Sequence, residues 1–171
     1  MEKYNKKLES GVYIMIIAMT LFTVSVVTYR YMFQTSQNFK KAIEKGFIVP
    51  DLDEDWSRQE KTVILALSTE CSFCTDSSNF YKLLTDKSDQ NREIKIMAVF
   101  PQDKKVSEIY LKNIGVKIDT VKQAKLRDLG VIATPTIILV DSKRQVVDSW
   151  VGKLDEKSQT EVVEAIFKRN H

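Results

Sequence analysis

The apolar positions of this chain form one long N-terminal run and several short runs farther along. The short runs include Thr62–Ser68, Glu93–Phe100 and Ile137–Val140, and they are rich in β-branched residues. Such runs are typical of strands that are covered on both faces. Segments with helical spacing lie between them, and this alternation predicts an α/β fold.

The stretch from Thr62 to Leu84 predicts a strand, a sharp turn and a helix, in that order. The turn carries Cys71 and Cys74. Helical spacing begins at once, because one helix face is formed by Phe73, Ser77, Phe80, Tyr81 and Leu84. We therefore expect Cys71 in the first turn of the helix, with Cys74 on the same side.

This position favours redox chemistry at Cys71. A thiolate at a helix N-terminus faces unpaired backbone N–H groups and the positive end of the helix dipole. Both lower the thiol pKa, typically into the range of about 3.5 to 7.5, and give a nucleophile near neutral pH. A dithiol/disulfide couple of Cys71 and Cys74 is the interpretation we favour.

Three other interpretations of the two cysteines remain. Half of a zinc site would need more ligands, yet the chain has two cysteines and its one histidine is His171. A structural disulfide across so small a loop would restrict the unfolded chain very little. Two unpaired core thiols are the third alternative, because free cysteines are commonly buried. We expect no metal site.

The long N-terminal run, Val12 to Tyr29, contains no charged residue. As a helix it would extend about 27 Å, close to the bilayer hydrocarbon thickness of about 30 Å. Aromatic residues typical of the membrane interface flank the run, as in a transmembrane helix. A cleaved signal peptide and a buried helix are the alternative interpretations of this run. The expected organisation is a short cytoplasmic tail (1–11), a transmembrane helix (12–33), a juxtamembrane segment (34–46) and a globular domain (47–171).

The N-terminal tail and the cysteines together predict the side of the membrane on which the globular domain lies. Basic residues on the two sides of the run are nearly balanced, but short basic tails stay in the cytoplasm. A CxxC pair without other thiols also suits an oxidising compartment. We expect a single-pass membrane protein with its domain outside the cytoplasm. The net charge of +3 is scattered, so a nucleic-acid surface is not expected.

The remaining pattern completes the predicted domain. After the second strand we expect a helix to Ile114, a strand at Val116–Val121 and a short helix at Lys122–Leu129. A hairpin turn at Asp141–Arg144 leads into the last strand, and an amphipathic helix follows.

Four features together resemble the thioredoxin fold. They are Cys71-Ser72-Phe73-Cys74, the loop Ala133-Thr134-Pro135-Thr136, the hairpin ILVDSKRQVVDSWVG and an extra αβ unit at Lys104–Val121. The combination is most similar to membrane-anchored thiol:disulfide oxidoreductases of the bacterial envelope, the TlpA/ResA-like branch of the redoxin group. The resemblance covers Phe47 to about Lys168 and implies a mixed central sheet flanked by helices.

The resemblance also implies roles for individual residues. Cys71 would be the attacking thiol and Cys74 the resolving thiol, with their redox-active disulfide in place of any other cofactor. Pro135 would be a cis-proline facing that disulfide, and Thr134 would offer backbone hydrogen bonds to a bound chain. The remaining site-shaping positions would be Glu70, Ser72 and Phe73. Glu70 stands where the family usually has tryptophan, and Leu65 stands where thioredoxins carry a buried acid.

The predicted function is therefore a membrane-anchored thiol:disulfide oxidoreductase, with a reducing role favoured by the resemblance. Its partners would be envelope proteins bearing thiols or disulfides, and a membrane protein would supply electrons. A thiol peroxidase is an alternative, since Ser68 stands three residues before Cys71. A non-catalytic or copper-binding thioredoxin-like module is another, although copper sites usually add histidine to two thiols.

Overall fold

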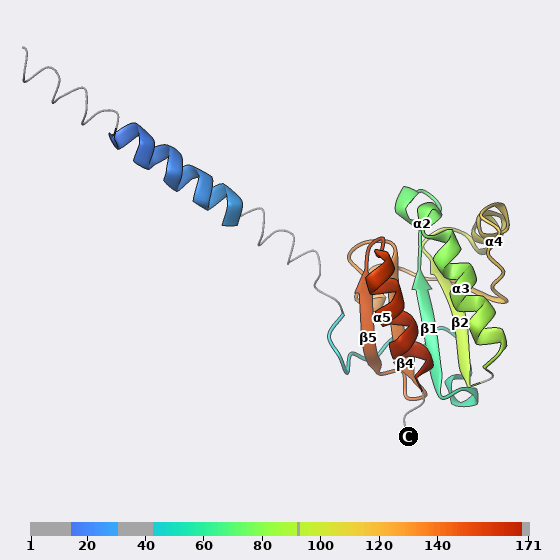
Figure 1. The fold of residues 1–171 in the computed structure, drawn as a ribbon. Coiled ribbons are helices and arrows are strands. Elements are labelled where there is room, and N and C mark those ends of the chain that lie inside the picture. The colour runs from blue at the N-terminus through green and yellow to red at the C-terminus, as the bar shows by residue number, and fades with distance from the viewer. Residues whose placement is uncertain (1–14, 31–42, 92, 169–171) are drawn as a thin grey trace, which may run out of the picture. The chain divides into compact units, whose positions relative to one another are not determined.

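The computed structural model describes residues 15–30, 43–91 and 93–168. The chain separates into two compact units, Met1–Lys41 and Ala42–His171 (Figure 1). The division falls inside the predicted juxtamembrane segment, so the second unit contains the whole predicted globular domain.

The first unit contains a helix over residues 15–30, whose side chains are exposed. No helix in the described ranges combines the length and the apolar character needed to span a membrane. Both ends of the predicted transmembrane segment 12–33 lie outside the described residues, as do the tail 1–11 and most of the segment 34–46.

The second unit alternates strands and helices, which confirms the predicted α/β class. Its elements, in chain order, are η1 (Trp56–Arg58), β1 (Lys61–Ala66), α2 (Ser72–Asp76), α3 (Ser78–Asp89), β2 (Ile94–Phe100), α4 (Lys104–Asn113), β3 (Thr120–Gln123), η2 (Leu126–Leu129), β4 (Thr136–Asp141), β5 (Val146–Val151) and α5 (Glu156–Phe167).

The five strands form one mixed sheet in the order β3-β2-β1-β4-β5. β1 runs parallel to β2 and antiparallel to β4, and β5 pairs antiparallel with β4. The helix α4 and the parallel edge strand β3 form the αβ unit predicted between the second strand and the cis-proline loop. β1 is therefore central, and its carboxyl end lies beside the start of β4 (Figure 1).

Apolar side chains cover both faces of the sheet. Alternate residues of a strand point to opposite faces, so Val63 and Leu65 join one core cluster while Ile64 and Ala66 join the other. The first cluster packs against residues of α3 and α5, and the second against Val49 and other residues that precede β1. Burial on both sides explains why β1 reads as an unbroken apolar run.

The predicted continuous helix after the cysteines is wrong at Ser77. The structure has two helices, and Ser77 ends α2 before α3 begins. The hydroxyl of Ser77 donates to the carbonyl of Phe73 at 2.8 Å, and the backbone N–H of Ser77 donates to the same carbonyl at 3.1 Å. Phe73, which helical spacing places on one face with Phe80, Tyr81 and Leu84, is 57% exposed. Phe80, Tyr81 and Leu84 are buried as predicted.

Two predictions near the edge strand are also wrong in position. The strand expected at Val116–Val121 is β3, Thr120–Gln123, because its pairing with β2 begins where Met97 meets Thr120. Val116 is nevertheless buried, which explains the apolar pattern before the strand. In place of the helix expected at Lys122–Leu129, the structure has only the 3₁₀ turn η2, because Lys122 and Gln123 belong to β3.

Candidate redox site

Cys71 occupies the N-cap position of α2, immediately after the loop that leaves β1. Its Sγ accepts a hydrogen bond from the backbone N–H of Cys74 at 3.3 Å. A side chain in this position normally satisfies one of the unpaired N–H groups of the helix start. Here a sulfur atom has that role, and a thiolate would accept the bond more strongly than a thiol.

A second loop approaches Cys71 from far along the chain. The Cys71 thiol donates to the carbonyl oxygen of Thr134 at 3.3 Å. The contact follows from the sheet, because β1 and β4 are antiparallel and Ala66 pairs with Thr136. The peptide bond between Thr134 and Pro135 is cis. The sheet thus brings together the two motifs on which the resemblance depends.

The surroundings of Cys71 favour its ionised form. The side chain is partly exposed, and both cysteines are free thiols. Partial burial alone would raise the Cys71 pKa, but hydrogen bonds from the Cys74 and Thr134 side chains and from backbone N–H groups outweigh it, so the pKa is lowered. Cys71 is therefore suited to nucleophilic attack.

Cys74 lies in the opposite environment. It is 0% exposed and belongs to the core cluster that packs against α3. Burial, together with its hydrogen bond to Cys71, raises the pKa of Cys74 to about 12. One turn of helix therefore separates a thiol that ionises readily from one that stays protonated.

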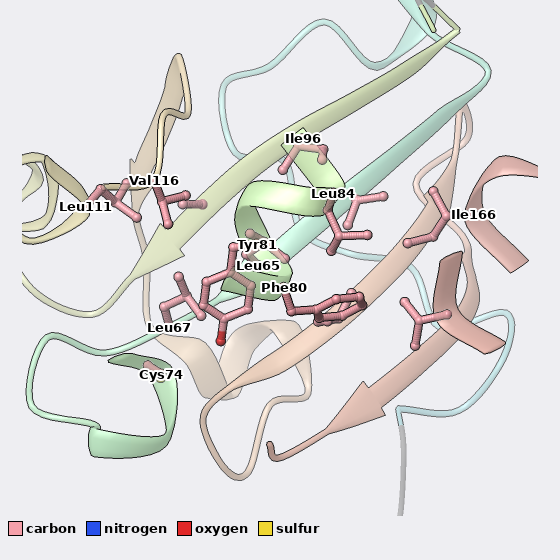
Figure 2. Close-up of a cluster of buried hydrophobic side chains, with 14 of the residues drawn as sticks. Leu65, Leu67, Cys74, Phe80, Tyr81, Leu84, Ile96, Leu111, Val116 and Ile166 are labelled. Carbon is pink, nitrogen blue, oxygen red and sulfur yellow. The ribbon is translucent and has the colours of Figure 1, made fainter. Parts of the chain in front are cut away.

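Two tyrosines adjoin the buried side of the site. Figure 2 shows the hydroxyl end of Tyr81 directed toward the turn that carries Cys74. That hydroxyl is buried and has no hydrogen-bond partner among the described residues. Burial raises the Tyr81 pKa, and the nearby Cys74 adds to the rise. The hydroxyl of Tyr110, on α4, lies 3.1 Å from that of Thr75 and ties α4 to α2.

The other predicted site residues lie near Cys71 with different exposure. The exposed ones are Glu70, Ser72 and Phe73, which surround Cys71 along the turn. Thr134 is partly exposed and Pro135 is buried. Leu65, in the place of the buried acid, is fully buried in an apolar cluster.

Sequence reasoning missed two features beside Cys71. The first is an open pocket of about 510 Å³, lined in part by Ser68, Val131 and Thr134, with Ile132 72% exposed at its wall. The second is Gln102, which donates to the hydroxyl of Ser68 at 3.0 Å. A glutamine after a strand has no distinctive sequence pattern, so no signal pointed to it.

A metal site finds no support in the described residues. Among them, no three histidine, cysteine or acidic side chains lie close enough together to hold a metal ion. The arrangement instead offers two neighbouring thiols, one reactive and one buried, which can exchange electrons as a disulfide forms or breaks.

Comparison with known proteins places the fold. No family model matches the chain, and no curated protein matches it. Solved structures do match over most of their length. A Chlorobium tepidum protein provisionally named thiol:disulfide interchange protein DsbE has 18% identity and a TM-score of 0.59, with 72% of this chain and 99% of that chain covered.

Two further structures agree. A thiol-disulfide isomerase from Corynebacterium glutamicum has 12% identity and a TM-score of 0.56, covering 77% of this chain and 97% of its own. The thioredoxin domain of a thiol-disulfide oxidoreductase from Bacteroides vulgatus has 17% identity and a TM-score of 0.54, covering 72% and 97%. At these identities the likeness establishes the fold, which is thioredoxin-like as predicted.

Proposed function

We propose that this protein is a thiol:disulfide oxidoreductase that uses Cys71 to attack and Cys74 to resolve. The observation that carries the proposal is the contrast between the two thiols. Cys71 caps a helix, is partly exposed and has a lowered pKa, whereas Cys74 is buried with a raised pKa. The thioredoxin-like fold and the names of its structural neighbours support the same chemistry.

The proposed reaction proceeds in two exchanges. The Cys71 thiolate attacks one sulfur of a substrate disulfide, a mixed disulfide forms, and the other substrate sulfur leaves as a thiolate. Cys74 then gives up its proton to solvent or to the departing thiolate and attacks Cys71 Sγ. The Cys71–Cys74 disulfide forms and the second substrate thiolate leaves. The substrate gains two electrons and the protein loses two.

Protein disulfides are the substrate class that this surface fits best. Phe73 on α2 and Ile132 on the loop that carries Thr134 are apolar and exposed, at 57% and 72%. Scattered apolar side chains are ordinary on a protein surface, but here they flank a reactive thiol and an open pocket. Glu70 and Ser72 are the exposed polar residues on either side of Cys71 in the chain. Thr134 is the proposed backbone contact for the bound chain.

Direction and location are further parts of the proposal. By the family resemblance the protein acts as a reductant, on envelope proteins, and receives electrons from a membrane protein. The uncharged run Val12–Tyr29 would anchor it with the thioredoxin-like domain outside the cytoplasm. A reporter that is active only in the cytoplasm, fused after His171, should be silent. Cytoplasmic activity of this fusion would contradict the proposed location, and a mature N-terminus near Ser25 would contradict the anchor.

The decisive test of the chemistry is an equilibrium titration of the two cysteines against glutathione and dithiothreitol, together with a turnover assay on a disulfide-bonded protein. A reductant should show a low potential for the couple and should reduce the protein disulfide catalytically. A high potential would reverse the proposed direction. Rapid turnover of hydroperoxides without reduction of disulfides would replace the proposal by a thiol peroxidase, and a couple inert to both would favour a binding module.

A further inference from the structure

The loop between β1 and Cys71 is held by side chains. Leu67 still bonds to the sheet, donating to the carbonyl of Val99 at 2.9 Å. Beyond it, the backbone N–H of Thr69 donates to Gln102 Oε1 at 3.4 Å, and that of Glu70 donates to Ser68 Oγ at 3.3 Å. These two loop amides therefore depend on the side chains of Gln102 and Ser68.

Gln102 uses both ends of its amide in this contact. Its Nε2 donates to Ser68 Oγ at 3.0 Å while its Oε1 accepts from Thr69. The reversed amide would place a donor against the Thr69 N–H, so this orientation alone satisfies the loop. The network then reaches the reactive residue, because the Cys71 N–H donates to the carbonyl of Ser68 at 3.2 Å.

The other side of the network is fixed to the sheet. Only Pro101 separates Gln102 from the end of β2, and the turn that carries Gln102 is hydrogen-bonded to the edge strand β3. Ala124 N–H donates to the carbonyl of Phe100 at 2.9 Å, and Gln123 Nε2 donates to that of Pro101 at 3.4 Å. The glutamine amide thus links the end of two strands to the loop before Cys71.

We propose that Gln102 is a positioning residue for Cys71, which holds the loop Ser68–Glu70 so that the thiol stays over the start of α2 and against Thr134. The inference rests on the proposed thiol chemistry and extends it to a residue that touches neither cysteine. Loss of the link frees the loop, and Cys71 Sγ then spends less time in its bond from the Cys74 N–H. The ionised thiol loses stabilisation as a result.

The test is thiolate absorbance titration of the reduced full-length protein. Gln102→Leu should raise the pKa of Cys71 by roughly half a unit to one unit. The lower thiolate fraction, partly offset by the higher nucleophilicity of the more basic thiolate, should slow its reaction with oxidised glutathione at pH 7 about two- to fourfold. Cys74 does not interfere, because its pKa is about 12.

Gln159→Leu is the matched control. Gln159 is partly buried like Gln102, and its amide donates to the carbonyl of Leu154 at 3.0 Å at the start of α5. The control should leave both the Cys71 pKa and the reaction rate unchanged. An unchanged pKa in Gln102→Leu, or an equal rise in the control, overturns the proposal.

Gln102→Glu separates geometry from charge. A carboxylate can still accept from Thr69 N–H and from the Ser68 hydroxyl, so the link survives, but a negative charge is added. In Gln102→Glu the added charge raises the Cys71 pKa, and this rise should shrink in about 1 M salt. The rise of the Cys71 pKa in Gln102→Leu should persist. Equal salt dependence of the two variants would contradict the geometric role.

Ser68→Ala provides a second route if Gln102→Leu does not fold. It removes the oxygen that accepts from Gln102 and Glu70, and it should raise the Cys71 pKa in the same direction. In the double variant the two effects should be less than additive; full additivity counts against a shared link. The titration needs no substrate, so a protein that fails to exchange disulfides can still confirm or overturn this inference.

Discussion

Cys71 and Cys74 lie one helical turn apart, yet their environments differ in burial and in the direction of their pKa shifts. Cys71 is partly exposed at the start of α2, where its sulfur accepts from the Cys74 N–H and its thiol donates to the Thr134 carbonyl. Cys74 is fully buried in the apolar cluster below. The comparison shows that position in the helix, rather than the residue type, gives the two thiols opposite pKa shifts, on which the proposed attacking and resolving roles depend.

The largest expected effect comes from removing one thiol at a time. Cys74→Ser should accumulate mixed disulfides with partner proteins, because Cys71 can attack but nothing releases it. Cys71→Ser should form none, since its remaining thiol is buried and protonated. Non-reducing electrophoresis after acid quenching measures both. Equal adducts from the two variants would mean that both thiols are simply accessible, and adducts from Cys71→Ser alone would reverse the roles.

Alkylation of the reduced protein should sharpen the same contrast. At pH 7 iodoacetamide should modify Cys71 at least about thirtyfold faster than Cys74. The pKa of Cys74 is about 12 and that of Cys71 is lowered, and only part of the resulting difference in thiolate fraction is offset by the weaker nucleophilicity of the more acidic thiol. Mass spectrometry of quenched time points gives the two rates. Comparable rates would show that Cys74 is exposed in solution, and a denatured sample, with both thiols equivalent, is the control.

As pH rises, the two thiols should change the free energy of unfolding in opposite directions. Cys74 ionises at about pH 8.5 in the unfolded chain but at about 12 in the folded one, so the unfolded state holds fewer protons between these values. Stability should therefore fall as pH rises above about 8.5, by up to roughly 1.4 kcal/mol per pH unit. Cys71 acts oppositely, because its lowered pKa adds stability as pH rises toward the ordinary thiol value.

Denaturant unfolding of the reduced protein from pH 7 to 10 measures this effect. Cys74→Ser should flatten the fall between pH 8.5 and 10. The raised pKa values of Tyr81 and Tyr110 add to the fall at higher pH, so the comparison is best made below pH 10. A wild-type curve as flat as that of Cys74→Ser would contradict the raised pKa of Cys74.

The smallest effect concerns Glu70, next to Cys71 in the chain. A nearby carboxylate disfavours a thiolate, so Glu70→Gln should lower the Cys71 pKa by a few tenths of a unit. Glu70 is exposed, and solvent screening keeps the effect small. Thiolate absorbance titration in low salt measures it. An unchanged or raised pKa would show that the side chain points away from the sulfur.

The parts of the structure that the sequence predicts are those governed by local pattern. The central strands are unbroken apolar runs, and the amphipathic face with Phe80, Tyr81 and Leu84 follows helical spacing. The placement of Cys71 at a helix start needed only the strand, the turn and the helix in order. The fold class and the candidate thiols can therefore be predicted from the sequence alone.

The parts that the sequence could not predict depend on contacts between distant segments. The edge strand begins at Thr120 because of its register with β2, which alternation within Val116–Val121 does not encode. Ser77 divides the helix because its backbone dihedrals, φ −88° and ψ 3°, are not helical, which propensity alone does not foresee. Gln102 and Ser68 are 34 positions apart and meet only because β1 and β2 pair.

The antiparallel pairing of β1 with β4 has a consequence for the order of assembly. The bond between Cys71 and Thr134 joins residues 63 positions apart, and only Pro135 separates Thr134 from the start of β4. A chain emerging from the ribosome exposes both cysteines, and even the parallel neighbour β2, well before that loop exists. During this interval the Cys71 thiol lacks its partner, the Thr134 carbonyl. The complete site, with the Thr134 carbonyl against Cys71, is thus assembled only after the chain up to β4 has been made.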